Sequence, residues 1–120
     1  MKCSASVMVV DDEAMNSAIL KRRLDRKGFN VEAATNGQEA LDAVVADPFP
    51  DLILMDLMMP VMDGWEATKR IKEQFPLVKV IAVSAKADEE YSYKEKGFDD
   101  FCKKPIEWEF LMKKICKALS

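Results

Sequence analysis

Short, continuous apolar runs alternate with longer amphipathic stretches along the chain. Residues 7–10 are apolar throughout, which is typical of a strand that is covered on both faces of a sheet. Further strands are predicted over residues 29–34, the run that ends at Asp56, and residues 78–84 and 100–103. Helices are predicted between and after them, over residues 14–27, 38–46, about 65–74, 88–96 and 106 to about 119.

Helical spacing of apolar residues predicts which side of each helix is buried. The inward-facing residues are expected to be Asn16, Ile19, Leu20 and Leu24 in the first helix, Ala40, Leu41, Val44 and Val45 in the second, Trp65, Thr68 and Ile71 in the third, and Trp108, Leu111, Met112, Ile115 and Leu119 in the last. The predicted helix at 88–96 is short and polar. Gly28 and Gly97 stand where a glycine commonly ends a helix.

The regular alternation of strand and helix predicts one α/β domain over residues 1–120. Five parallel strands would form a doubly wound sheet with helices on both faces. Asn30, Glu32 and Thr35 make the second strand more polar than the others, so we expect it at an edge of the sheet. In such sheets, functional groups gather beyond the carboxyl ends of the strands.

Composition narrows the classes of function. The 120 residues are 49% hydrophobic and 32% charged, with a net charge of −3, so neither a basic surface for nucleic acid nor a membrane-binding patch is expected. The three cysteines are widely spaced and match no zinc or disulfide pattern, which favours free thiols in the cytoplasm. Histidine is absent, which excludes a histidine-based catalytic triad and a phosphohistidine carried by this chain.

Polar groups stand at the predicted carboxyl ends of the strands. Asp11 and Asp12 follow the first strand, Asp56 ends the third, Ser84 the fourth, and Lys104 follows the fifth. Converging carboxylates repel one another, and Mg²⁺, which prefers oxygen ligands, would relieve that repulsion. With a hydroxyl and an ammonium group nearby, this set could hold a phosphoryl group on a carboxylate nucleophile.

Each of these residues also has an ordinary structural explanation. The acids at 11–13 are compatible with a solvated helix start, and Asp56 with a turn after a strand. Ser84 and Lys104, taken singly, are more often a helix cap and a surface charge. The four positions in combination favour a functional site.

Four motifs in order make the whole chain resemble a response-regulator receiver domain of two-component signalling. They are VVDDE at 9–13, LMDLMMPVMDG at 54–64, AVSA at 82–85 and KKP at 103–105. Each motif alone is weak, whereas all four at suitable separation are specific. The resemblance implies a flavodoxin-like strand order of 2-1-3-4-5.

The resemblance also implies roles for individual residues. Asp56 would accept a phosphoryl group from a phosphohistidine on a partner protein. Asp11, Asp12 and Asp56 would hold Mg²⁺, with the backbone carbonyl of Met58 as a further ligand. Lys104 would pair with the phosphate, and its bond to Pro105 is expected to be cis.

Two further positions match the family's switch residues. Ser84 corresponds to the switch hydroxyl, and Phe101 to the switch aromatic residue, here without a hydroxyl. Their movement would reshape the face formed by the fourth helix, fifth strand and fifth helix, for an unknown output partner or a second copy of the chain. Met58 and Lys86 match positions that influence the lifetime of the phosphoryl group.

The implied phosphoryl donor is a histidine kinase or a histidine phosphotransfer protein, and the implied function is a switch with weak self-catalysed transfer and hydrolysis. Two alternatives stay open. The first is a small Mg²⁺-dependent phosphatase, but Met58 replaces the general acid such enzymes usually have two residues after the nucleophile. The second is a scaffold that is never phosphorylated. Because the chain ends just after its last helix, we expect either a stand-alone receiver or a piece of a hybrid kinase or larger regulator.

Overall fold

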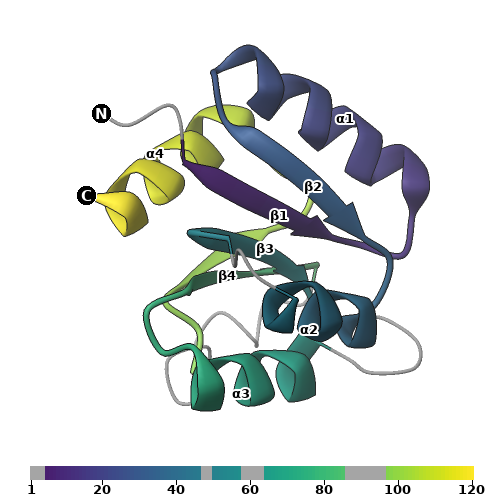
Figure 1. The fold of residues 1–120 in the computed structure, drawn as a ribbon. Helices are drawn as coiled ribbons and strands as arrows, with labels where there is room; N and C mark the ends of the chain where they lie inside the picture. Colours follow the sequence, from purple (N-terminus) through teal and green to yellow (C-terminus); the bar gives the residue numbers. More distant parts are fainter. Residues whose placement is uncertain (1–4, 47–49, 58–63, 86–96) are drawn as a thin grey trace.

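Five parallel strands form one sheet at the centre of the molecule (Figure 1). The computed structural model describes residues 5–46, 50–57, 64–85 and 97–120. Within these ranges the elements are β1 (Ser6–Val10), α1 (Ala14–Arg26), β2 (Asn30–Ala34), α2 (Gly37–Val45), β3 (Leu52–Asp56), α3 (Gly64–Gln74), β4 (Lys79–Ser84), β5 (Asp100–Lys103) and α4 (Trp108–Leu119). The strand order β2-β1-β3-β4-β5 confirms the predicted topology, including β2 at an edge.

Helices cover both faces of the sheet: α1 and α4 lie on one face, α2 and α3 on the other (Figure 1). Side chains alternate between these layers, as the two-residue period of a strand requires. Val7 and Val9 pack in the layer of α1 and α4, whereas Met8 and Val10 pack in the layer of α2 and α3. Because both faces are buried, the central strands are apolar at nearly every position.

Local signals explain where the first helix ends. Gly28 follows α1 with φ of 97°, a left-handed conformation that glycine adopts without a Cβ clash. The Phe29 N–H then donates to the Leu24 carbonyl at 3.2 Å, which also accepts from the Lys27 N–H at 3.0 Å, so the chain reverses onto the last turn of the helix. The predicted role of Gly28 is therefore confirmed.

Two residues predicted to face inward are exposed. Ile19 is 50% exposed, because Ser17, Leu20 and Leu24 form the buried stripe of α1 and Ile19 lies beside it along a surface groove. Val45 is 54% exposed, because it lies in the last turn of α2, one turn beyond Leu41, which is buried. In both cases helical spacing alone made the predicted apolar stripe wider than the buried one.

Element boundaries agree with the prediction to within two residues. The largest difference is at the last helix, where α4 begins at Trp108 rather than at residue 106. The Lys104–Pro105 peptide bond is cis, as expected. The predicted helix at 88–96 lies outside the described residues, and Gly97, which was expected to end it, has φ of 94°.

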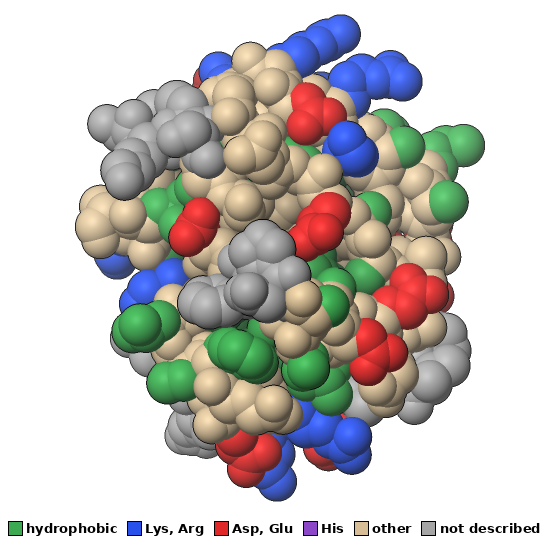
Figure 2. Space-filling model, viewed as in Figure 1, with side chains coloured by type: hydrophobic (Ala, Val, Ile, Leu, Met, Phe, Trp, Pro, Cys, Tyr) green, Lys and Arg blue, Asp and Glu red, His purple; other side chains and the backbone are tan. Residues whose placement is uncertain are grey.

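The described surface carries both signs of charge. Acidic and basic side chains are interspersed on the face shown in Figure 2, and neither sign forms a continuous patch there. Among the described residues, none of the helices has the length and apolar character that crossing a membrane requires.

Candidate functional site

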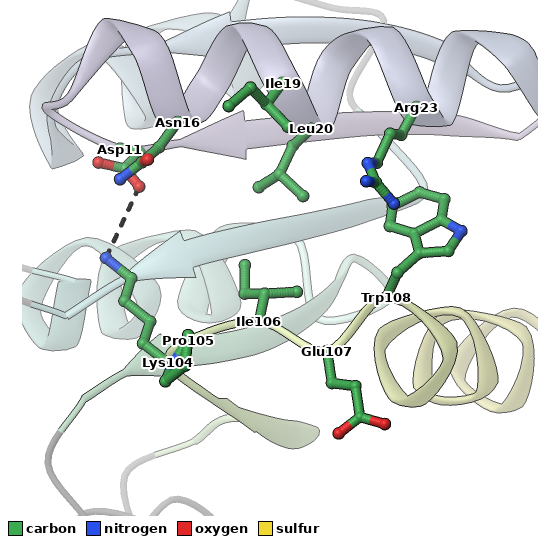
Figure 3. Close-up of a pocket in the computed structure, with 10 residues that line it drawn as sticks. All are labelled: Asp11, Asn16, Ile19, Leu20, Arg23, Lys104, Pro105, Ile106, Glu107 and Trp108. Atoms are coloured by element: carbon green, nitrogen blue, oxygen red, sulfur yellow. Dashed lines mark ion pairs between the residues drawn. The ribbon is translucent and has the colours of Figure 1, made fainter.

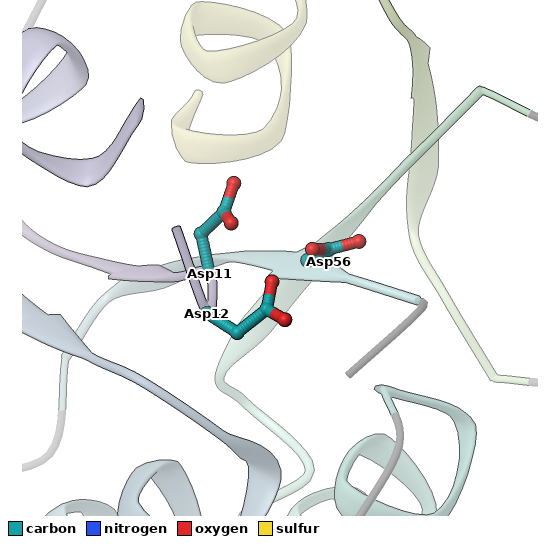
Figure 4. Close-up of side chains that lie close together, drawn as sticks. All are labelled: Asp11, Asp12 and Asp56. Carbon is teal, nitrogen blue, oxygen red and sulfur yellow. The ribbon is translucent and has the colours of Figure 1, made fainter. Parts of the chain in front are cut away.

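Three carboxylates meet at the carboxyl ends of two neighbouring central strands (Figure 4). Asp11 and Asp12 follow β1, and Asp56 is the last residue of β3. Because Val10 pairs in register with Met55, the residues that follow them reach the same level of the sheet. Each residue offers one carboxylate oxygen, and these oxygens lie within 4.8 Å of one another.

Lys104 supplies positive charge between two of these acids. Its Nζ lies 3.7 Å from Asp11 Oδ2 and 3.6 Å from Asp56 Oδ2. Both aspartates are only 5% exposed, so their charges are poorly screened by water and need a nearby cation. The Lys104 backbone is held at this rim because its N–H donates to the Ser84 carbonyl at 2.9 Å.

Asp11 is held in place by backbone hydrogen bonds. The Glu13 N–H donates to Asp11 Oδ1 at 2.9 Å, and the Asp11 N–H donates to the Ala34 carbonyl at 3.1 Å. Asp12 is exposed, and Glu13 makes no side-chain cap at the start of α1. Asp11 is therefore a buried and oriented acid, which a solvated helix start does not require.

Ser84 and Phe101 are buried beside this rim. Ser84 ends β4 at 1% exposure, and Phe101 lies in β5 at 3% exposure, paired in register with Ala82. Phe101 and Ala82 belong to the hydrophobic core on the α2–α3 side of the sheet. Met58 and Lys86 lie outside the described residues.

The comparison with known families matches this arrangement. The family model described as "Response regulator receiver domain" matches residues 7–116. This range includes both edge strands of the sheet, β2 and β5, and all the rim residues named above. This chain belongs to the response regulator receiver domain family.

The relatives of this chain differ in how much of their own length the receiver domain occupies. Two-component response regulator 24 of Arabidopsis thaliana is 39% identical over 103 residues, which cover 84% of this chain and 74% of that protein. Hybrid signal transduction histidine kinase I of Dictyostelium discoideum is 35% identical over 128 residues, covering 94% of this chain but only 7% of that protein. The chain thus corresponds to most of one relative and to a small part of the other.

One similar solved structure has the same fold and contains Mg²⁺-BeF. The response regulator TrrA from Thermotoga maritima, in complex with Mg²⁺-BeF, superposes with a TM-score of 0.87 at 28% identity, covering 96% of this chain and 99% of that one. This likeness confirms the predicted receiver fold.

A groove leads away from the rim of the receiver domain (Figure 3). It has a volume of about 570 Å³ and runs between α1 and residues 104–108. Asp11 and Lys104 lie at one end, and Arg23 lies over the Trp108 ring at the other, 5.2 Å from its centroid. The sequence alone does not reveal this groove, because no local pattern indicates that Arg23 and Trp108 meet.

A glycine that the sequence patterns did not single out lies against the rim. Gly64 begins α3 and is buried against the end of β3. The available signal in the sequence was a glycine at the start of a helix, eight residues after the acid that ends a buried strand.

Two groups outside the rim, Cys102 and Glu39, have pKa values displaced by their surroundings. Burial raises the pKa of the Cys102 thiol in β5, which favours its protonated form. The hydrogen bond from the Thr35 N–H lowers the pKa of Glu39. Cys102 and Cys116 are free thiols, as predicted; Cys102 is buried and Cys116 is partly buried.

Proposed function

We propose that this receiver domain, taken as one unit over residues 1–120, is a phosphorylatable switch with Asp56 as its phosphoacceptor. One observation carries the proposal: the nearly buried Asp56 carboxylate lies within reach of two other carboxylates and of the Lys104 ammonium. A buried acid cluster costs stability unless it is neutralised, so its presence favours a functional role. The position of Asp56 in the family motif supports it, rather than Asp11, as the acceptor.

Mg²⁺ is the proposed cofactor, and the donor set fits it. Asp11, Asp12 and Asp56 offer three hard oxygen ligands within 4.8 Å of one another, and the partial exposure of the cluster at Asp12 leaves room for water ligands. When bound, the ion would neutralise charge on the phosphoryl oxygens. The backbone carbonyl of Met58 is proposed as a further ligand, and the Mg²⁺-BeF complex of TrrA is consistent with this chemistry.

The proposed step is a transfer between two nucleophiles. The Asp56 carboxylate attacks the phosphorus of a partner's phosphohistidine, a P–O bond forms, and the P–N bond breaks with its electron pair left on the imidazole. Lys104 already contacts the Asp56 carboxylate, so it can pair with the incoming phosphoryl oxygens after a small movement. Ser84, at the end of the neighbouring strand, would donate its hydroxyl hydrogen to another of these oxygens.

Phosphorylation would bias an existing equilibrium between two states. If Ser84 moves toward the phosphoryl group, Phe101 gains space on the same side of the sheet. The proposed responsive face comprises β5, α4 and the helix predicted at 88–96. An output protein or a second copy of the chain would bind there, and direct binding to nucleic acid is not expected.

The proposed phosphoryl donor is a histidine kinase or a histidine phosphotransfer protein. The groove beside the rim supports a donor that is a protein, because it continues well beyond the space that a phosphoryl group needs. Ile19 lines this groove, and Met15, one helical turn earlier, is 76% exposed. Apolar side chains exposed beside a reactive carboxylate are suited to a protein contact.

Phosphoramidate, a small donor with a P–N bond, provides the test. After incubation with Mg²⁺, intact-mass measurement should show one phosphoryl adduct on the wild type and none on Asp56→Asn or after Mg²⁺ is chelated. Steady hydrolysis of a phosphomonoester would instead favour a phosphatase. An unmodified wild-type protein would contradict the switch and favour a scaffold.

A further inference from the structure

Gly64 approaches the phosphoacceptor strand more closely than any side chain would allow. A Cβ added at Gly64 would lie 2.4 Å from the Asp56 carbonyl oxygen, 3.0 Å from Leu57 Cα and 3.0 Å from Met55 Cγ. Ordinary contacts of a Cβ begin at 3.4 Å, so the closest pair would have to separate by about 1 Å, the difference between 3.4 and 2.4 Å. The missing side chain therefore allows α3 to begin directly against the end of β3.

The atoms that would be displaced belong mainly to the backbone of the acceptor strand. The Met55 side chain can adjust, but the Asp56 carbonyl and Leu57 Cα are part of the main chain. That main chain is held by β4, since Asp56 pairs in register with Val83 and the Leu57 N–H donates to the Val83 carbonyl at 3.2 Å. A substitution at Gly64 would therefore either tilt the Asp56–Leu57 peptide or push the start of α3 away.

We infer that Gly64 is a positioning residue for the Asp56 carboxylate. The inference rests on the proposed function, in which Asp56 is the nucleophile. A tilt of the Asp56–Leu57 peptide would move the carboxylate relative to Lys104, 3.6 Å away, and relative to the other two acids. Misplacement of a reacting group by about 1 Å can reduce a rate by about 100-fold.

The chain offers a matched control at Gly97. Its φ of 94° makes any other residue strained, yet an added Cβ would meet nothing within 4 Å. A Gly97→Ala variant should therefore lose stability through backbone strain without moving the acceptor strand. Gly64→Ala and Gly64→Ser should behave alike, because the Cβ itself makes the clash.

The experiment compares these three variants with the wild type, each as the chain of 120 residues. The rate of phosphorylation by phosphoramidate at saturating Mg²⁺ is expected to fall about 10- to 100-fold in both Gly64 variants. Their Kd for Mg²⁺ should rise severalfold, and the NMR shifts of the Asp56 carbonyl carbon and the Leu57 amide should change. Gly97→Ala should keep the wild-type rate, Kd and shifts at these two residues.

Several results would overturn the inference. One is a wild-type rate and Kd in Gly64→Ala, with higher stability, because alanine is simply the better helix former. Another is the same loss in Gly97→Ala. If Gly64→Ala does not fold, the same measurements are made with Thr68→Val added, which should stabilise the fold because the buried Thr68 hydroxyl has no hydrogen-bond partner among the described residues. Failure to fold there as well would mean that Gly64 serves the fold rather than Asp56. A wild type that accepts no phosphoryl group would refute the proposed function, while the Mg²⁺ and NMR measurements would still test Gly64.

Discussion

The interior of the central strands and their carboxyl ends have opposite characters. Residues 52–55 of β3 are apolar and at most 1% exposed, and the next residue is the charged, nearly buried Asp56. The same change occurs in β1, where Val10 is followed by Asp11, and β4 ends at the buried Ser84. The interior thus stabilises the fold by excluding water, whereas the rim keeps like charges together at a cost in stability. A buried acidic rim on an apolar sheet indicates that this edge serves function.

The largest expected effect comes from the interior. Leu54→Ala removes a side chain that is 1% exposed in the core between the sheet and the α1–α4 layer. We expect the free energy of unfolding to fall by about 2–5 kcal/mol, because apolar burial is lost and a cavity remains. Urea unfolding followed by circular dichroism measures this. Leu77→Ala, at a residue that is 82% exposed, is the control and should change stability by less than about 0.5 kcal/mol.

Lys104→Met should destabilise the rim by a smaller amount. It leaves Asp11 and Asp56 buried without the ammonium that contacts both. Because Lys104 itself is 25% exposed, water screens part of the interaction, and we expect a loss of about 1 kcal/mol without Mg²⁺. The loss should shrink when Mg²⁺ is added. Lys103→Met, at an exposed neighbouring lysine, should be close to neutral, and equal effects in the two variants would contradict the proposed charge balance.

Thr68→Val tests an exception inside the apolar interior. Thr68 in α3 is fully buried, and its hydroxyl oxygen has no hydrogen-bond partner among the described contacts. Replacing this hydroxyl with a methyl group should raise the free energy of unfolding by about 1 kcal/mol. Thr68→Ser keeps the hydroxyl and loses the methyl group, so it should destabilise. Chemical denaturation of both variants decides the matter, and a destabilised valine variant would mean that the hydroxyl does have a partner.

The smallest expected effect is a pH dependence far from both regions. Glu39 accepts the Thr35 N–H at 2.9 Å, which lowers the pKa of Glu39 below its ordinary value of 4.5 in the folded state. Its contribution to stability is therefore present above pH 4.5 and is lost as pH falls through the folded-state pKa. Glu39→Gln should be slightly less stable than the wild type at pH 7, and the gap should close at low pH. A gap that is constant from pH 7 to pH 3 would contradict the shift.

The same contrast explains what could be predicted from the sequence. The apolar strands, the sheet order and the acids at strand ends carry local patterns, and the structure brings Asp11, Asp12, Asp56 and Lys104 together as expected. Ile19 was misplaced because helical spacing shows which side of a helix is apolar, but not where the neighbouring elements stop covering it.

Contacts between residues far apart in the sequence were beyond such patterns. The approach of Gly64 to the Asp56 carbonyl depends on how α3 packs against β3, and the stacking of Arg23 on Trp108 depends on how α1 packs beside α4. Neither leaves a local periodic signal. Both became visible only when the tertiary structure was known.

The identity of the residue that carries the phosphoryl group tests the central proposal most directly. Borohydride reduces an aspartyl phosphate to homoserine, so peptide mass spectrometry after treatment with phosphoramidate and Mg²⁺ can locate it. We predict homoserine at Asp56 in the wild type, and no conversion when Mg²⁺ is chelated. Conversion at Asp11 or Asp12 with Asp56 intact, or no conversion at any aspartate, would contradict the proposal.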